Sequence, residues 1–237
     1  MTGTRVIARA ALMGAAVVLG TSMLAASAGA VTFCASGTDT DGHIAGCAAI
    51  TLTSNSLSVV LTNTQNNPTS LGQLVSGFDI VLSTTPSSVS GLTQSGQLID
   101  VASNGSVTQV SGNPTHWGAA ISGSTLFIAT AGTGAPGGNP INMIINGNTS
   151  SNFNTDGLTN TNQQPFIQGP GTFGLTLNGL TSTPSITSVS IEFGTGPEAD
   201  LTATPVPGPI LGAGVPGLVM GCAGLLALAR RRRQKFI

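Results

Sequence analysis

The sequence predicts an all-β fold, namely an antiparallel β-sandwich, for which a jelly-roll-like topology is one option. An N-terminal signal helix and a C-terminal transmembrane helix are predicted to flank this domain. Three observations carry this prediction. Short segments alternate apolar and polar residues with a period of two, as half-buried strands do. Asn-Gly and Asp-Gly pairs, which favour tight turns, separate these segments. The central region is rich in Gly, Ser, Thr and Asn and contains no amphipathic helix pattern.

The first 30 residues have the pattern of a secretory signal peptide. Arg5 and Arg9 give it a positive start, an apolar stretch follows, and small residues permit cleavage after Ala28 or Ala30. A permanent N-terminal anchor is the alternative interpretation of this segment. The signal peptide predicts that the ectodomain, residues 31–204, is exported.

Charge is distributed very unevenly along the chain. All seven Lys and Arg residues lie near the two ends, and the eight Asp and Glu residues lie between them, so the region 10–229 has a formal charge of −8. Nucleic-acid binding depends on Lys and Arg that neutralise phosphates, so this composition excludes a nucleic-acid partner. It also offers no arginine or lysine to hold a nucleotide, and we expect no cofactor.

Export makes the cysteines interpretable. Cys34 and Cys47 have twelve residues between them. In an oxidising compartment they are expected to form a disulfide that fastens the mature N-terminus to the first strand, with a contribution to stability of about 3 kcal/mol. Two buried free thiols are the alternative. Cys222 lies in the apolar tail, where a small packing role is expected.

The central region reads as a series of about nine short strands with turns between them. The clearest strands fall within residues 48–64, 76–83, 125–130, 141–146, 172–180 and 186–194. Within them, three sets of residues are expected to face the core: Leu57, Val59 and Leu61; Phe173, Leu175 and Leu177; and Val189, Ile191 and Phe193. Residues 146–165 are expected to form a long polar loop, which is either functional or loosely ordered.

Catalytic groups are few. His116 is one of only two histidines, and the G-x-S-x-G turn that presents a nucleophilic serine is missing from the sequence. A Ser-His-Asp arrangement would need a base next to a nucleophile and an acid to orient it. The favoured interpretation is that His116 and Trp117 close a strand or turn, with Trp117 half in the core.

Asp39, Asp41 and His43 occupy alternate positions, as the first ligands of a Ca²⁺ loop do. The rest of that pattern is missing, because Ile50 stands where the loop needs a glutamate. The favoured interpretation is a solvated turn inside the disulfide loop, without a metal.

Asp79 and Glu192 both lie on predicted strands, so a pair of carboxylates of the glycosidase type is conceivable. Each of them, however, occupies a position where the alternation predicts an outward polar residue. A solvated sheet face is therefore the favoured interpretation, and no catalytic residue is assigned.

The last 33 residues, 205–237, form a three-part tail. Prolines alternate at the start of this tail, an uncharged run of twenty residues follows over 210–229, and five basic residues lie within 230–235. Twenty apolar residues are long enough to cross a bilayer as a helix, and the basic cluster is expected to stay on the cytoplasmic side.

This arrangement resembles the PEP-CTERM sorting signal of Gram-negative bacteria. The matching residues are Val206, Pro207, Gly208 and Pro209 as the motif, 210–229 as the span, and Arg230, Arg231, Arg232 and Arg233 as the basic stop. The usual motif is Val-Pro-Glu-Pro, and here Gly208 replaces the Glu. This difference leaves open which exosortase variant recognises the signal. Several stretches within 61–198 are also similar to ectodomains of PEP-CTERM proteins of unknown function.

The resemblance implies that an exosortase recognises and cuts the tail at the inner membrane, and that the protein then passes to the cell surface or to the exopolysaccharide matrix. An ordinary single-pass anchor is the alternative for the tail. For the ectodomain we expect a non-enzymatic surface or matrix role. A lectin-like glycan-binding module is the first alternative, although one Trp and no Tyr leave few stacking residues. A secreted hydrolase is the second.

Overall fold

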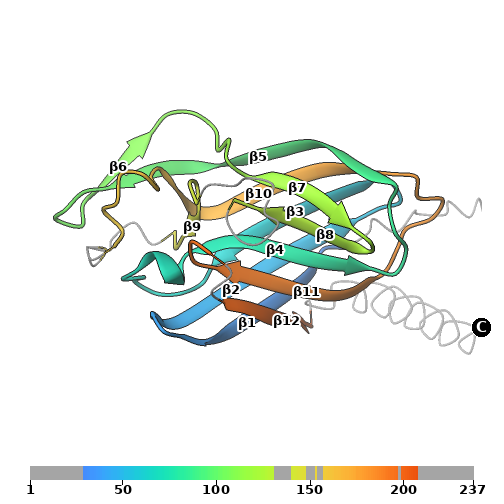
Figure 1. The fold of residues 1–237 in the computed structure, drawn as a ribbon, viewed down its shortest axis with the longest axis horizontal. Coiled ribbons are helices and arrows are strands. Elements are labelled where there is room, and N and C mark those ends of the chain that lie inside the picture. The colour runs from blue at the N-terminus through green and yellow to red at the C-terminus, as the bar shows by residue number, and fades with distance from the viewer. Residues whose placement is uncertain (1–28, 131–139, 148–152, 154–156, 197–198, 208–237) are drawn as a thin grey trace, which may run out of the picture.

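The computed structural model describes residues 29–130, 140–147, 153, 157–196 and 199–207. These residues form twelve strands and one short 3-10 helix (Figure 1), and the prediction of an all-β fold is confirmed. The elements are β1 (Val31–Asp39), β2 (Gly42–Leu52), β3 (Ser56–Asn63), η1 (Leu71–Gln73), β4 (Val75–Leu82), β5 (Ser88–Val101), β6 (Val107–Val110), β7 (Gly118–Ser122), β8 (Thr125–Ala129), β9 (Ile144–Ile145), β10 (Phe166–Asn178), β11 (Ile186–Phe193) and β12 (Ala199–Val206).

The two predicted flanking helices, the signal helix and the span 210–229, lie outside the described residues except for the last two positions of the signal peptide. Within the part of the chain that the structure describes, every helix is too short or too polar to cross a membrane.

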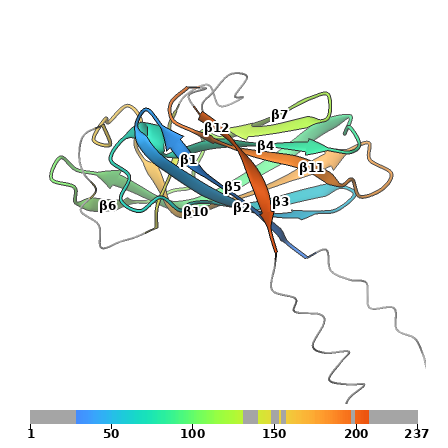
Figure 2. The ribbon, with the colours of Figure 1, turned by 90° about the horizontal axis from the view of Figure 1, so that it is seen from below.

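All twelve strands belong to a single hydrogen-bonded sheet with the order β6-β5-β10-β3-β2-β1-β12-β11-β4-β8-β7. The two-residue strand β9 pairs with both β10 and β4. It thereby closes a ring of eight strands in the order β10, β3, β2, β1, β12, β11, β4 and β9. Viewed from its edge, the sheet is flattened into two layers (Figure 2). The predicted sandwich of two separate sheets is therefore corrected to one continuous sheet folded over its own core.

The main core lies between the two layers and contains the side chains that the alternation predicted. Leu57, Val59 and Leu61 of β3 are at most 2% exposed, and the predicted faces of β10 and β11 are buried with them. Phe173 lies among aromatic neighbours, with ring centroids 4.5 Å from Trp117 and 6.1 Å from Phe78.

A second, smaller core is built partly from the segment that the sequence predicts as a polar loop. Phe153 and Leu158 are buried there with apolar residues of β5 and β10. Gln164 fixes this segment to β5, because its Nε2 donates to the carbonyls of Val101 and Leu158, both at 3.0 Å, and its Oε1 accepts from the Val101 N–H. The end of the segment 146–165 is therefore packed rather than a free loop.

The strand β9 separates the two cores. Ile144 points into the main core, whereas Met143 and Ile145 point into the second one. Buried Asn63 donates its Nδ2 to the carbonyl of Ile144 at 3.1 Å and to that of Gln73 at 2.8 Å. A two-residue strand has little stability of its own, so these side-chain bonds hold it in place.

Asn142 shapes the approach to β9. Its φ of 64° lies in the left-handed region, which Asn tolerates better than most residues. Its Nδ2 donates to the carbonyl of Pro165 at 2.9 Å, its Oδ1 accepts the N–H of Thr115 at 3.0 Å, and its own carbonyl accepts the indole N–H of Trp117 at 2.8 Å. One buried amide therefore joins three separate segments.

The structure also contains strands that the sequence did not reveal. The segment between the cysteines is a hairpin formed by β1 and β2 and not a loop. β5 runs for 14 residues, but all of its first ten are exposed or half-buried, so it lacks a clear apolar face. β12 continues to Val206, so the predicted domain boundary at residue 204 falls inside a strand.

Asn63→Ala should destabilise the fold. Removing the amide leaves the carbonyls of Gln73 and Ile144 buried without their side-chain donor, which costs about 1–3 kcal/mol. Urea unfolding measures this loss as a lower midpoint. Asn113→Ala is the matched control, because Asn113 is exposed. Equal unfolding midpoints for the two variants would show that Asn63 does not hold β9.

Candidate functional site

Asp79 of β4 and Glu192 of β11 lie on the outer face of the sheet. Their strands are hydrogen-bonded neighbours, with Asp79 opposite Ser190 and Glu192 opposite Gly77, so the two carboxyls are diagonal neighbours. Gly77 has no side chain, and the Glu192 carboxyl occupies the place that a Cβ there would take. This gap lets Glu192 reach toward Asp79 and hydrogen-bond to it.

Partial burial raises the pKa of both groups. The pKa of Glu192 is raised from 4.5 to about 8, mainly by loss of solvent and then by the charges of Asp79 and Asp200 and the hydrogen bond to Asp79. The pKa of Asp79 is raised from 3.8 to about 6, mainly by loss of solvent; the hydrogen bond from Glu192 opposes this rise and the charge of Asp200 adds to it. Glu192 is thus the donor, and at neutral pH the pair holds one proton.

The proton substitutes for a basic side chain. The region 10–229 contains no Lys or Arg, so no cation from the domain can neutralise the pair. Asp200 of β12, opposite Glu192, adds a third carboxyl nearby. The Oδ1 atom of Asp79 is buried and makes no hydrogen bond to the described residues. The arrangement can therefore take up and release a proton between mildly acidic and mildly alkaline pH.

The alternation places Asp79 and Glu192 on the outer face, as the structure does, but the two residues are half-buried rather than fully solvated, because register and Gly77 bring them together. The pair nevertheless does not have the geometry of a glycosidase. Retaining glycosidases keep their carboxyls about 5–5.5 Å apart and inverting ones about 6.5–9.5 Å. Two carboxyls in a direct hydrogen bond leave no room between them for a sugar atom or an attacking water.

The predicted disulfide is present. Cys34 and Cys47 lie directly opposite each other on β1 and β2, with an S–S distance of 2.07 Å and a Cα–Cα distance of 4.1 Å. Both are half-buried on the outer face. The bridge joins two adjacent strands of the sheet, one of which begins at Val31, directly after the predicted signal peptide.

Asp39 and Asp41 lie at the turn of the β1–β2 hairpin, next to Gly42, whose φ is 106°. His43 Nδ1 is 2.6 Å from Gln65 Oε1, so its ring is held by an amide. Among the described residues, no three His, Cys, Asp or Glu side chains are close enough to hold a metal ion. The turn interpretation fits this geometry.

His116 and Trp117 immediately precede β7, as the turn interpretation predicts. His116 Nδ1 lies 3.1 Å from Asn142 Oδ1 and 3.3 Å from Thr115 Oγ1, so its described partners are an amide and a hydroxyl. Trp117 is only 4% exposed, which is more buried than the sequence suggested. It therefore cannot serve as a stacking platform for a sugar.

The structure describes only the beginning of the predicted sorting motif. Val206 is the last residue of β12, is 43% exposed and pairs with Thr32 of β1. Pro207 follows and is also exposed. Gly208, Pro209 and the arginines 230–233 lie outside the described residues.

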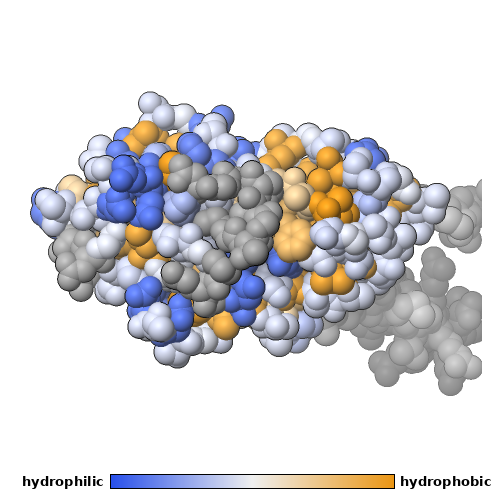
Figure 3. Space-filling model, in the orientation of Figure 1, coloured by the Kyte–Doolittle hydropathy of each residue, from blue (hydrophilic) through white to orange (hydrophobic). Residues whose placement is uncertain are grey.

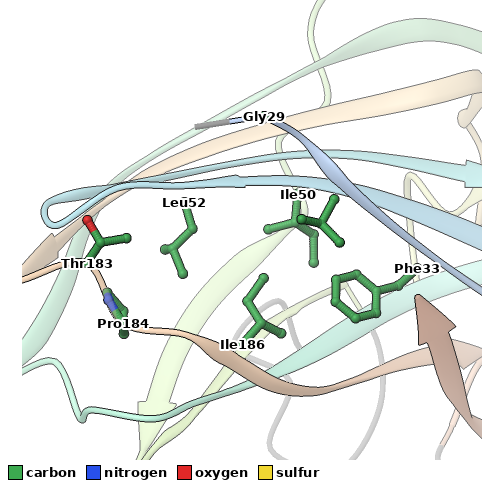
Figure 4. Close-up of a pocket in the computed structure, with 8 residues that line it drawn as sticks. Gly29, Phe33, Ile50, Leu52, Thr183, Pro184 and Ile186 are labelled. Carbon is green, nitrogen blue, oxygen red and sulfur yellow. The ribbon is translucent and has the colours of Figure 1, made fainter. Parts of the chain in front are cut away.

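An apolar hollow of about 260 Å³ opens beside the start of β1 and the end of β2. Figure 4 shows the side chains of Phe33, Ile50, Leu52 and Ile186 pointing toward one another around it, with Pro184 at its edge. Sequence patterns did not indicate this site, because most of its residues are ordinary apolar residues of three strands that meet at one end.

The outer face of β3, β10 and β5 has a different character. Its exposed side chains are uncharged, and most are hydroxyls. In register across the three strands lie Ser56, Thr176 and Ser90; Ser58, Gly174 and Thr93; and Val60, Thr172 and Ser95. We call this array the hydroxyl face. It can offer many hydrogen bonds and has no charge of its own.

Comparison of the chain with protein-family models, curated proteins and solved structures finds no match in any of the three.

Glu192→Gln should flatten the dependence of stability on pH. The unfolded chain releases these protons near the ordinary pKa values of 3.8 and 4.5, whereas the folded chain keeps them to about 6 and 8. The folded state therefore binds more protons across that window, and the free energy of unfolding falls as pH rises through it.

Thermal unfolding between pH 4.5 and 9 measures this dependence. Asp41→Asn, at the exposed hairpin turn, is the control and should keep the wild-type slope. An unchanged slope in Glu192→Gln would rule out the shared proton.

Proposed function

We propose that this chain is a non-enzymatic exported protein of the cell surface or exopolysaccharide matrix. Residues 205–237 hold it transiently in the inner membrane, where an exosortase cuts it. One observation supports this proposal most strongly. Thr32 at the start of β1 pairs with Val206 at the end of β12, so the domain's two ends leave side by side from the same end (Figure 2). A domain of this kind is presented away from the membrane by its tail.

The disulfide also supports export. Bonds of this kind persist in oxidising compartments such as the periplasm and are rare in the cytosol. The bridge between Cys34 and Cys47 lies on the strand that directly follows the predicted signal peptide. The same strand pairs with β12, so the bridge stabilises the part of the domain from which the tail departs.

The hydroxyl face supports exopolysaccharide as a partner after release. A neutral surface rich in Ser and Thr can hydrogen-bond sugar hydroxyls without repelling an acidic polymer, as carboxylates would. This observation favours the glycan-binding alternative to that extent, although the buried Trp117 supplies no stacking surface. The hydrolase alternative has less support, given the partners of His116 and the closeness of Asp79 and Glu192.

Changing Pro207 and Pro209 together to Ala tests the proposal. The prolines keep the motif extended, as a protease groove requires, and their loss leaves the span and its basic flank unchanged. We expect the variant to accumulate uncut in the inner membrane of an exosortase-producing host. Wild type should be recovered from the surface or medium, shorter by about thirty residues.

Pro170→Ala is the matched control, since Pro170 is exposed in β10 and distant from the motif in sequence. This variant should be cut like the wild type. Mass spectrometry of the recovered proteins locates the new C-terminus. Wild-type protein that keeps its arginine tail in such a host would contradict the proposal.

A further inference from the structure

The end of the domain from which the chain leaves carries an apolar patch, bordered by the exposed polar residues 83–85 and 181–183. We call it the tail end and define it by the residues around the hollow, together with Val206: Gly29, Val31, Phe33, Ile50, Leu52, Thr183, Pro184 and Ile186. Val31 and Val206 are 45% and 43% exposed, and they are two of the three large apolar side chains that are exposed among the described residues. The only other one is Val60 on the hydroxyl face.

The described carboxylates lie away from this end. Asp39 and Asp41 lie at the far hairpin of β1 and β2, Asp100 near the far end of β5, and Glu192 and Asp200 where β11 meets the start of β12. Asp79 lies in the middle of β4. In Figure 3 the most hydrophilic residues gather mainly in the half that carries β6, and the larger hydrophobic patch lies over β7 and β8, toward the tail end. Charge and apolar surface are therefore segregated along the length of the domain.

The tail end lies close to the apolar span along the chain. Only residues 207–209 separate Val206 from Ile210, the first residue of that span. A fully extended chain covers at most about 3.6 Å per residue, so Val206 lies within about 14 Å of Ile210. The head-group layer occupies roughly 5–8 Å of that distance on one side of a bilayer. Little room remains for water between the tail end and the lipid.

We propose that the tail end docks on the lipid surface of the inner membrane, with Val31 and the mouth of the hollow in the interface between head groups and acyl chains. This inference rests on the proposed function, in which 210–229 spans that membrane. Docking removes the exposed apolar residues from water and keeps the carboxylates away from anionic head groups. It also holds the motif at the membrane surface, where a membrane-embedded protease can reach it.

A fluorescent probe in the full-length protein tests the docking. In a Cys222→Ala background, Thr183→Cys places the probe at the rim of the hollow and Thr40→Cys places it at the opposite hairpin; both threonines are exposed. The proteins are reconstituted into vesicles of phosphatidylethanolamine and phosphatidylglycerol that contain doxyl-labelled lipid. We expect quenching and a blue shift of the probe at position 183, and neither change at position 40.

Substitutions at two exposed valines test which surface of the domain contacts the lipid. Val31→Asp should reduce the quenching at position 183, because it puts a charge into the interface. Val60→Asp should leave it unchanged, since Val60, 37% exposed, lies on the outer sheet face. Equal effects of the two substitutions would overturn the proposal.

Labelling of native Cys222, which lies in the span 210–229, distinguishes failure of docking from failure of the span to insert. Cys34 and Cys47 do not interfere, because they are bonded to each other. If Cys222 resists a water-soluble maleimide while the probe at position 183 stays unquenched, the span is inserted and docking alone is refuted. If the maleimide labels Cys222 freely in the reconstituted protein, both the tether and the docking are refuted.

Discussion

The fold depends on the closure of its sheet at β9. This strand has only two residues, yet it joins β10 to β4 and places Ile144 in one core and Ile145 in the other. Met143 continues the same alternation into the second core and accepts the N–H of Ile167 at 2.9 Å through its carbonyl. Without this short strand, β10 and β4 would have unpaired backbone groups between two apolar clusters, which is costly in a buried position.

Buried amide side chains supply the hydrogen bonds that a two-residue strand is too short to make by itself. Asn63, Asn142 and Gln73 are at most 4% exposed, and each bonds to backbone groups of segments distant in sequence. Amides suit this role because each offers donors and acceptors without a charge to desolvate. A chain without Lys or Arg over 10–229 has no basic partner for buried carboxylates. Where two carboxyls are partly buried, at Asp79 and Glu192, a shared proton takes that place.

The sequence allowed parts of this structure to be predicted. The clean alternation in β3, β10 and β11 identified core faces correctly, since each of these strands has one apolar side. The disulfide was predicted from the spacing of the cysteines and the predicted export, whereas the hairpin that contains it was not predicted. β5 was missed because most of its first ten residues are small or polar on both faces, and β9 was expected as a strand without its closing role.

The remaining features depend on long-range pairing. Phe153 and Leu158 are too widely spaced to indicate a second core inside a polar segment. The pairing of Asp79 with Glu192 requires the register of β4 against β11, and only the glycine at position 77 hints that a side chain crosses there. The apolar tail end is likewise invisible until β1, β2 and β11 are placed together.

Amide hydrogen exchange measures most directly whether the closure at β9 holds the molecule together. The N–H of Ile167 bonds to Met143, and the N–H of Asn142 bonds to the carbonyl of Pro165. If the closure at β9 holds the sheet together, both amides should exchange only when the whole domain unfolds. Their opening free energy should then equal that of the amides of β2 and β3. Exchange of both through a local opening much less costly than global unfolding would contradict this account.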